Sequence, residues 1–315
     1  MNFKNGLIAA LTGTAITTSI VITRPLISVA FDGQELSTTT REITVLINSS
    51  NGSNGSGVII SKKGNTYYVL TANHVTSKRG DKNGDIEYTV IAHDKKPYPI
   101  DPDTIKPVAN DLDMAIFEFQ SVREYPVATI SSSELVETTP VFVSGWQRPG
   151  TVNSTTVTRQ ITSSRITTIL EEDVHGGYQI GYDNTTLGGM SGGPVVDAEG
   201  RLVGVHGLAD SDTPETIGFE NDSADARTIS ELLKTGFNYG IPIRTFLSEA
   251  AQSGIYLNLD VENSPPEELT DTPVIETDPE KDQIDDINSV LDDVERVRDV
   301  IERFPDVIPR LPSGL

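Results

Sequence analysis

Short stretches that alternate apolar and polar residues follow one another from residue 42 to about residue 259. Glycine, asparagine, aspartate and proline separate these stretches, which include ITVLIN, GVIISKKGNTYYVLTA, IEYTVIA, DMAIFEF, PVFVSGW, YQIGYD and RLVGVHG. Alternation with a period of two residues, broken at regular intervals by turn residues, is typical of an all-β sandwich or barrel. We therefore predict an all-β domain over residues 42–259, preceded by a short N-terminal segment over residues 31–41.

Two later segments carry apolar residues at helical spacing instead. The first is IPIRTFLSEAAQSGI, and it predicts one helix that closes the domain. The second spans residues 281–304, and its apolar stripe comprises Ile284, Ile287, Leu291, Val294 and Ile301. An amphipathic helix must bury such a face, and it does so against its own domain, against a second copy of the chain or against another partner. The sequence leaves these three arrangements open.

Residues 260–280 differ in composition from the domain before them, since they are rich in Pro, Glu, Asp and Thr and poor in apolar residues. This composition predicts a disordered acidic linker, and residues 305–315 form a further tail. Residues 261–315 hold 16 acidic against 5 basic residues, which is half of the net charge of -22. We expect a tail built in this way to be separable from the domain without loss of its activity.

The first 30 residues have the layout of a secretory signal peptide. Lys4 precedes an apolar, Thr-rich run, and the small residues Ser28 and Ala30 offer a cleavage site before Phe31. A retained membrane anchor is the alternative, but the run is short for a spanning helix. We predict a secreted or periplasmic protein with no stable membrane span after the signal is removed.

The overall charge and the residue types exclude several classes of function. A net charge of -22 argues against a nucleic-acid partner, because binding to phosphates needs clustered Lys and Arg. The absence of cysteine excludes disulfides, thiolate metal sites and cysteine nucleophiles. The segment DKNGDIE after Asp81 is similar to a calcium loop, but its glycine is not at the EF-hand position. We therefore predict no cofactor and no metal.

The stretch GGMSGGPVVD places Ser191 among four glycines, where a substrate can approach the backbone closely. A nucleophilic serine needs a base and a carboxylate that orients the base. His74 in YYVLTANHV lies where a strand ends, and Asp113 in NDLDMAIFEF begins an apolar strand. His93 and His175 lie in polar surroundings that are typical of surface loops. The G-x-S-x-G elbow of α/β-hydrolases does not fit. A hairpin pattern rather than a helix follows the serine, and the only later histidine, His206, comes just 15 residues after it.

The blocks LTANHV, DLDMAI and GGMSGGPVV, in this order, resemble those of trypsin-like serine endopeptidases of the chymotrypsin fold. GSGVII and VSGW extend the resemblance over about residues 42–257. It implies two antiparallel six-stranded β-barrels with a C-terminal helix, and a catalytic triad of His74, Asp113 and Ser191 that cleaves protein or peptide substrates. It also implies an oxyanion hole formed by the backbone N–H groups of Gly189 and Ser191. Asp111 is a rival for Asp113, but DMAI fits the block better than DLDM does.

The resemblance departs from animal trypsins at two places. Met190 stands before the serine, where an aspartate would pair with a new N-terminus, and Thr185 stands where a trypsin holds the aspartate that binds Lys or Arg. TTLGG and GVHG are instead similar to the glutamyl endopeptidase branch. That branch implies that Thr186 and His206 bind a substrate carboxylate, with cleavage after Glu. The alternative is a pocket for small or apolar residues.

Two other functions remain as alternatives to this secreted endopeptidase. One is a catalytically silent protease-fold protein that binds a partner through the 281–304 helix, which is also a candidate for oligomerisation. The other is a Deg-type quality-control protease, which GSGVII allows. We rank it third, because such enzymes append a PDZ domain and the composition of residues 260–315 is not that of such a domain.

Overall fold

The computed structural model describes residues 32–77, 86–148, 155–174, 176–209, 212, 224–233, 235–266, 269, 273, 275 and 277–294. The predicted signal peptide, the tail over residues 305–315, His175 and most of the DKNGDIE segment lie outside these residues.

The first half of the chain builds a seven-stranded antiparallel sheet in the order β5-β4-β1-β2-β3-β7-β6. Its strands are β1 (Thr44–Ser49), β2 (Asn54–Lys63), β3 (Thr66–Thr71), β4 (Tyr88–Ile91), β5 (Pro97–Ile100), β6 (Lys106–Pro107) and β7 (Ala115–Gln120). The inner face packs buried apolar and aromatic side chains, among which Tyr67 stacks on Phe119 at a centroid distance of 5.2 Å. The end strands β5 and β6 are not paired with each other in the sheet order, so the sheet is a half-barrel. The prediction of a closed six-stranded barrel is therefore wrong for this half.

The second half contains a closed ring of six strands, because β12 pairs with both β9 and β13. The ring runs β9-β10-β11-β14-β13-β12 and returns to β9. Its strands are β9 (Pro140–Gln147), β10 (Val157–Val174), β11 (Tyr178–Tyr182), β12 (Pro194–Val196), β13 (Leu202–Leu208) and β14 (Asn238–Pro242). Two short strands, β8 (Thr129–Ser131) and β15 (Asp260–Glu262), extend the sheet beyond β13. The mostly β architecture with one closed barrel is consistent with a chymotrypsin-like fold.

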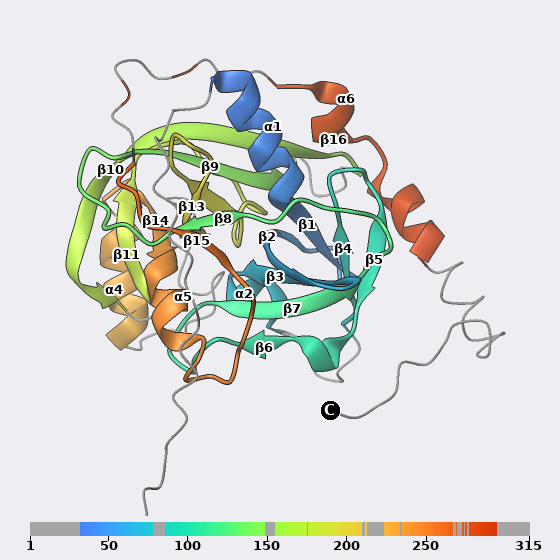
Figure 1. Ribbon diagram of the computed structural model, residues 1–315, viewed down its shortest axis with the longest axis horizontal. Helices are drawn as coiled ribbons and strands as arrows, with labels where there is room; N and C mark the ends of the chain where they lie inside the picture. Colours follow the sequence, from blue (N-terminus) through green and yellow to red (C-terminus); the bar gives the residue numbers. More distant parts are fainter. Residues whose placement is uncertain are drawn as a thin grey trace, which may run out of the picture.

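Short helices accompany the two sheets (Figure 1). They are α2 (Asn73–Thr76), the 3-10 helix η1 (Pro102–Thr104), α4 (Ala224–Leu233) and α5 (Ile243–Glu249). Of these, α4 and α5 lie on the outer side of the second sheet. The helix α5 lies where the sequence predicts the closing helix, and its Ile243 and Phe246 are buried. It packs against β13 and β14, whereas α4 lies against β10. The helices α4 and α5 therefore cover the second sheet, whereas α2 follows β3 and contacts β2.

A further helix, α1 (Gly33–Ile43), occupies the segment that the sequence analysis left without structure. Asp32 caps its N-terminus by accepting a hydrogen bond from the N–H of Glu35 at 2.8 Å. Leu36 is fully buried, and Arg41 is almost fully buried. The domain therefore begins at about residue 32 rather than at residue 42.

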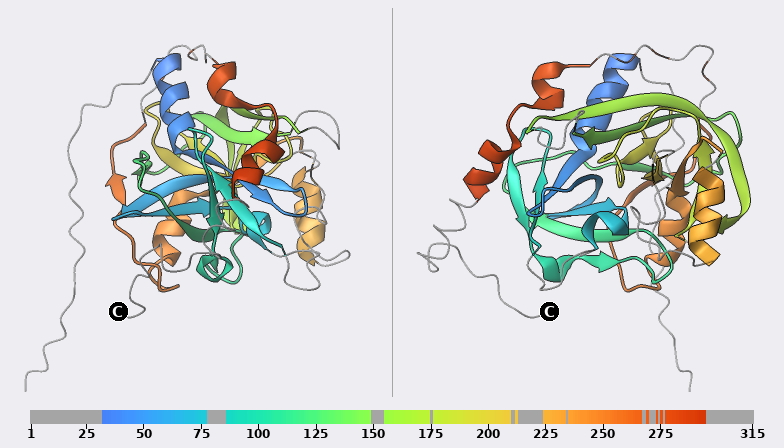
Figure 2. Two further views of the ribbon diagram at one scale, coloured as in Figure 1. Left: turned by 90° about the vertical axis from the view of Figure 1, so that its right-hand side faces the viewer. Right: turned by 180° about the vertical axis from the view of Figure 1, so that it is seen from behind.

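Described parts of the acidic segment after residue 259 pack on the domain, where the sequence analysis predicted a disordered linker over residues 260–280. Strand β15 pairs with β8, and α6 (Pro279–Asp282) leads into β16 (Gln283–Ile284), which pairs with β10. Residues 287–294 are helical, and α6 lies beside α1 at one edge of the molecule (Figures 1 and 2). The predicted helix over residues 281–304 is therefore interrupted at 283–286 and is described only as far as residue 294.

A buried carboxylate fixes this docked segment. Asp282 accepts hydrogen bonds from the Nε atoms of Arg41 at 2.8 Å and of Arg159 at 2.6 Å. Ile284 and Ile287 are buried beside Trp146. Asp282, Ile284 and Ile287 are thus part of the folded domain, and the expectation that cleavage survives removal of residues 261–315 stays a prediction. Within the described ranges no helix combines the length and the apolar character that crossing a membrane needs.

Candidate active site

His74 and Asp113 come from two neighbouring loops of the first sheet. His74 lies in α2, just after β3 ends, and Asp113 lies just before β7, the antiparallel partner of β3. The N–H of Asn73 donates to the carbonyl oxygen of Asp113 at 3.1 Å, and the N–H of His74 donates to Asp113 Oδ1 at 2.7 Å. The ring Nδ1 of His74 is 2.6 Å from Asp113 Oδ2. The pairing of β3 with β7 therefore brings the two side chains together.

The Asp113 carboxyl is held as an anion. Burial raises its pKa, but the charge of His74 and the hydrogen bonds from His74 and Tyr178 outweigh burial and lower the pKa below its ordinary value. The side chains of His74 and Asp113 are 10% and 11% exposed. A carboxylate in this position selects the imidazole tautomer that carries its proton on Nδ1. In that tautomer His74 Nε2 carries no proton and has the lone pair that a base needs.

Ser191 lies on a tight loop between β11 and β12, and the loop passes very close to the first sheet. Gly192 has φ +85°, and a side chain there would overlap Thr71 and the carbonyl oxygen of Ser56. The N–H of Ser56 donates to the carbonyl oxygen of Ser191 at 2.8 Å. These contacts explain the GGMSGG stretch, because the serine reaches the first sheet only where neighbouring residues lack a Cβ.

A cavity of about 270 Å³ is lined by His74, Ser191, Gly188 and Gly189, together with residues of β1 and β2. Gly189 has φ +100°, and its carbonyl oxygen accepts a hydrogen bond from Ser56 Oγ at 2.8 Å. In the described part of the chain no acceptor takes the N–H groups of Gly189 and Ser191. An oxyanion would bind such free donors, and these two lie on the loop that carries Ser191. The hydroxyl of Ser191 itself donates to the carbonyl oxygen of Gly207 at 3.4 Å.

The two residues predicted to bind a substrate carboxylate are both buried and both bonded within the protein. Thr186 donates its hydroxyl proton to Asn238 Oδ1 at 2.6 Å, and His206 Nδ1 is 2.9 Å from the hydroxyl of Tyr182. Burial and the nearby charge of His74 lower the pKa of His206 to about 3, against a weaker opposing effect of the Tyr239 backbone. His206 is therefore neutral at pH 7.

The remaining predicted candidates lie away from this site. The side chain of Asp111 is exposed. Its backbone carbonyl oxygen accepts a hydrogen bond from the N–H of Gly176 at 3.1 Å. His93 is half-buried beside Tyr125 and the carbonyl oxygen of Glu42. Among the described residues, no group of three or more His, Asp or Glu side chains is placed to hold a metal ion.

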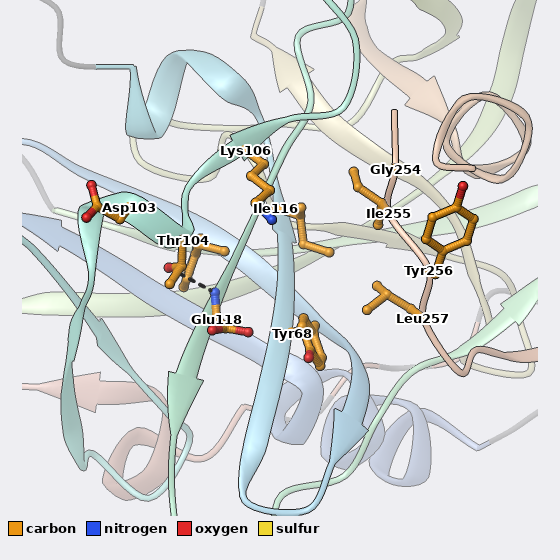
Figure 3. Close-up of a pocket in the computed structure, with 11 residues that line it drawn as sticks. Tyr68, Asp103, Thr104, Lys106, Ile116, Glu118, Gly254, Ile255, Tyr256 and Leu257 are labelled. Atoms are coloured by element: carbon orange, nitrogen blue, oxygen red, sulfur yellow. Dashed lines mark hydrogen bonds between the residues drawn. The ribbon is translucent and has the colours of Figure 1, made fainter. Parts of the chain in front are cut away.

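A second cavity, of about 420 Å³, lies between β7 and the segment after α5 (Figure 3). Lys106, Glu118 and Tyr256 are among its lining residues, and the N–H of Glu118 bonds to Thr104 Oγ1 at its wall. None of His74, Asp113 and Ser191 lines this cavity. The smaller cavity at Ser191 is therefore the candidate for catalysis.

Sequence reasoning missed two residues that organise the site. Tyr178 donates its hydroxyl proton to Asp113 Oδ2. Ser56 links the backbones of Trp146 and Gly189 through its hydroxyl, with both distances at 2.8 Å. Ser56 lies inside the GSGVII block that carries the family resemblance, so a signal was present. Tyr178 lies in no such block.

Comparison with known proteins shows what this part of the chain is similar to. Residues 55–205 match the family described as trypsin-like peptidase domain. The chain is 29% identical over 188 residues to the serine protease Do-like HtrB of Bacillus subtilis (strain 168), which covers 58% of this chain and 39% of the relative. It is 29% identical over 185 residues to the serine protease Do-like HtrA of the same organism, covering 57% and 39%.

Among solved structures, the crystal structure of Deg5 aligns with a TM-score of 0.48 and 20% identity over 68% of this chain and 89% of that one. The chain spans about two fifths of the length of the curated relatives that it matches. These relatives are Do-like proteases and lend no support to the glutamyl endopeptidase branch. Residues 55–205 are thus similar to trypsin-like peptidase domains, and the chain is similar over part of its length to two Do-like serine proteases of Bacillus subtilis, which supports the prediction of a serine endopeptidase.

Proposed function

We propose that the chain is a Do-like serine endopeptidase that hydrolyses peptide bonds in protein substrates through Ser191, His74 and Asp113. The observation that carries this proposal is the hydrogen bond of 2.6 Å between His74 Nδ1 and Asp113, in a cavity that His74 shares with Ser191. Homology to two Do-like proteases supports the type of protease, and it moves the alternative that the sequence analysis ranked third to first place.

The proposed reaction has two steps. His74 Nε2 takes the proton of the Ser191 hydroxyl while Oγ attacks the carbonyl carbon of the substrate, and the proton then passes to the leaving amine. Water repeats the sequence on the acyl-enzyme and releases the acid. The N–H groups of Gly189 and Ser191 stabilise the oxyanion of both tetrahedral intermediates, and each such donor contributes about 3–4 kcal/mol in comparable enzymes.

For the residue before the scissile bond, we propose a preference for uncharged side chains over Glu. The pKa of about 3 leaves His206 without charge at pH 7, and the Thr186 hydroxyl is already donated to Asn238. A Glu carboxylate would therefore meet no positive charge from these two residues. The competing prediction of cleavage after Glu would use His206 Nε2, which has no hydrogen-bond partner among the described residues, and would require Thr186 to leave Asn238.

A series of fluorogenic peptides that differ only in the residue before the scissile bond tests this preference. We expect kcat/KM for Val or Ala peptides to exceed that for the Glu peptide by at least about tenfold, which corresponds to about 1.4 kcal/mol. A preference for Glu that disappears in His206→Ala would instead support cleavage after Glu through that histidine. The Ser191→Ala variant supplies the blank.

Covalent labelling with a fluorophosphonate tests the nucleophile. We expect one label per chain on Ser191, no label in Ser191→Ala, and slow labelling in His74→Ala, because the serine then lacks its base. A folded wild-type sample that neither labels nor cleaves unfolded casein would contradict the proposal. That result would favour the catalytically silent binding protein.

Export and assembly are further proposals. We infer a secreted or periplasmic location from the predicted signal peptide over residues 1–30. Sequencing the N-terminus of protein recovered from outside the cytoplasm tests it, and a start near Phe31 is the expected result.

Assembly through the segment after residue 280 is tested by light scattering of the full chain.

A further inference from the structure

A tyrosine from the second barrel reaches the aspartate of the first sheet. The hydroxyl of Tyr178, the first residue of β11, donates to Asp113 Oδ2, which is also the oxygen that faces His74 Nδ1. The other carboxylate oxygen, Oδ1, accepts from the N–H of His74. Both oxygens of Asp113 are therefore engaged by three donors, two from His74 and one from the opposite barrel.

The tyrosine hydroxyl occupies space that a missing side chain leaves open. Gly207 lies on β13, and its carbonyl oxygen accepts the hydrogen bond from Ser191. A Cβ on Gly207 would lie 2.8 Å from Tyr178 Cζ and even closer to the hydroxyl oxygen, which real Cβ atoms do not tolerate. Glycine at position 207 is thus what allows Tyr178 to reach Asp113.

The turn before Tyr178 holds the loop of Asp113 from the same side. Gly176 and Gly177 have φ +94° and +83°, and the N–H of Asp113 donates to the carbonyl oxygen of Gly176 at 2.9 Å. The N–H of Gly176 donates in return to the carbonyl oxygen of Asp111 at 3.1 Å. The contact between the two barrels at this point therefore includes two backbone hydrogen bonds and the tyrosine hydroxyl.

Tyr178 is suited to donate rather than to accept. It is fully buried, and burial, followed by the charge of Asp113, raises its pKa well above the ordinary value. The phenol therefore keeps its proton across the pH range in which an endopeptidase works. A neutral donor of this kind favours the ionised form of Asp113 without adding a second charge to the site.

We propose that Tyr178 is a positioning residue for the peptidase reaction: its hydroxyl, given room by Gly207, fixes the Asp113 carboxylate and through it the orientation of the His74 imidazole. This inference rests on the proposed function and deepens it. It makes correct placement of the base depend on the second barrel, although His74 and Asp113 both belong to the first sheet. A small misplacement of a catalytic group lowers rates by up to about 100-fold, which sets the expected scale.

The test is Tyr178→Phe, which keeps the ring and removes only the hydroxyl. We expect kcat to fall by about 10- to 100-fold with KM nearly unchanged, because the substrate does not touch Tyr178. We also expect the downfield proton NMR signal of His74 Nδ1–H to shift or broaden. A merely structural role would move neither the signal nor kcat by itself.

Tyr67→Phe is the matched control. Tyr67 is also fully buried, and its hydroxyl donates to the carbonyl oxygen of Arg123 at 3.0 Å in the core of the first sheet. Removing this hydroxyl costs that hydrogen bond and the one that it accepts from the N–H of Tyr125 at 3.1 Å, without touching Asp113. Equal losses of kcat in the two variants would overturn the positioning role, and so would wild-type kcat in Tyr178→Phe.

Gly207→Ala is a second variant in case Tyr178→Phe does not fold. Its methyl group displaces the tyrosine hydroxyl from Asp113, so the same fall in kcat and the same change in the NMR signal are expected. A Gly207→Ala enzyme with wild-type kcat would overturn the inference. Failure of the proposed function is distinguishable, because the wild-type protein would then neither take the fluorophosphonate label nor cleave peptides.

Discussion

Gly192 adopts a backbone conformation that few other residues tolerate, and it does so in a very confined place. Its φ is +85°, and a Cβ would lie 2.9 Å from the backbone nitrogen of Ala72 and closer still to Thr71 and Ser56. Gly192→Ala therefore combines the cost of the left-handed backbone with that of the overlap with backbone atoms. We expect the free energy of unfolding to fall by about 2–5 kcal/mol, as measured by urea denaturation.

Gly188→Ala is the matched control for this substitution. Gly188 lies in the same loop without a positive φ, and a Cβ added there would have no atom within 4 Å. We expect the stability of this variant to stay within about 0.5 kcal/mol of the wild type. Equal destabilisation in both variants would contradict the steric explanation. The comparison thereby separates crowding at one glycine from a general sensitivity of the loop.

At the residue scale, sequence reasoning proposed those candidate site residues whose local motif is typical of the chemistry. His74, Asp113 and Ser191 each lie in a short block whose neighbours are constrained by the strand end or tight loop that presents the side chain. Tyr178 has no such block, because its role depends on where β11 meets the Asp113 loop. Pairing across two barrels is a property of the tertiary fold, so one sequence does not reveal it.

Among the structural elements, α6 has an unusual attachment to the domain. Asp282 is 2% exposed and binds Arg41 of α1 and Arg159 of β10, which are themselves buried. Asp282→Asn leaves two buried guanidinium groups without their counter-charge. We expect a loss of about 3–5 kcal/mol in the free energy of unfolding, the range seen when one partner of a buried ion pair is removed.

Asp285→Asn provides the control for Asp282→Asn, because it removes the same charge from an exposed side chain three residues later. Its effect on urea denaturation should be less than about 0.5 kcal/mol. If Asp282→Asn were as mild as this control, the tail would not be held by its ion pairs. The two variants together measure how firmly α6 is docked.

The same carboxylate predicts a dependence of stability on pH. Burial raises the pKa of Asp282, but hydrogen bonds from Arg41 and Arg159 dominate and lower it to about 2. In the unfolded chain the pKa is about 3.9, so the contribution to stability is complete above that pH and is lost as the pH falls toward 2. Because the group is buried, the contribution is about 2–3 kcal/mol.

We expect the difference in unfolding free energy between wild type and Asp282→Asn to shrink as the pH falls from about 5 to about 2. Urea denaturation at several pH values measures this difference directly. A difference that stayed constant over this range would mean that the Asp282 carboxylate does not titrate with the depressed pKa. The control Asp285→Asn should show no comparable trend.

The strands and the docked tail were not equally predictable from sequence. Strands such as β1, β7 and β13 follow from alternation and β-branched residues, and α5 follows from helical spacing. Residues 260–280 have the acidic, proline-rich composition of a linker, whereas Asp282, Ile284 and Ile287 dock the chain just beyond them. A buried aspartate is indistinguishable by composition from a solvated one, so the sequence did not reveal this docking.

At the scale of the whole molecule, a segment from the C-terminal part of the chain packs close to the loop that carries Ser191. The docked segment covers Trp146 on β9, and the N–H of Trp146 donates to Ser56 Oγ, which in turn donates to the carbonyl oxygen of Gly189. Hydrogen bonds therefore run from the residue beneath the tail to the loop that carries Ser191. The expectation that the tail can be removed without consequence for the domain does not fit this arrangement.

Trp146 is the single tryptophan of the chain and is fully buried, which makes its fluorescence a direct measure of docking. Truncation after residue 277 removes Asp282, Ile284 and Ile287 and opens this side chain to water. We expect a red shift of the emission, faster quenching by acrylamide, a lower melting temperature and a reduced kcat. Truncation after residue 294 keeps the docked segment and should leave the fluorescence unchanged. Unchanged emission after truncation at residue 277 would contradict this prediction. It would mean that Ile284 and Ile287 do not cover Trp146 in solution.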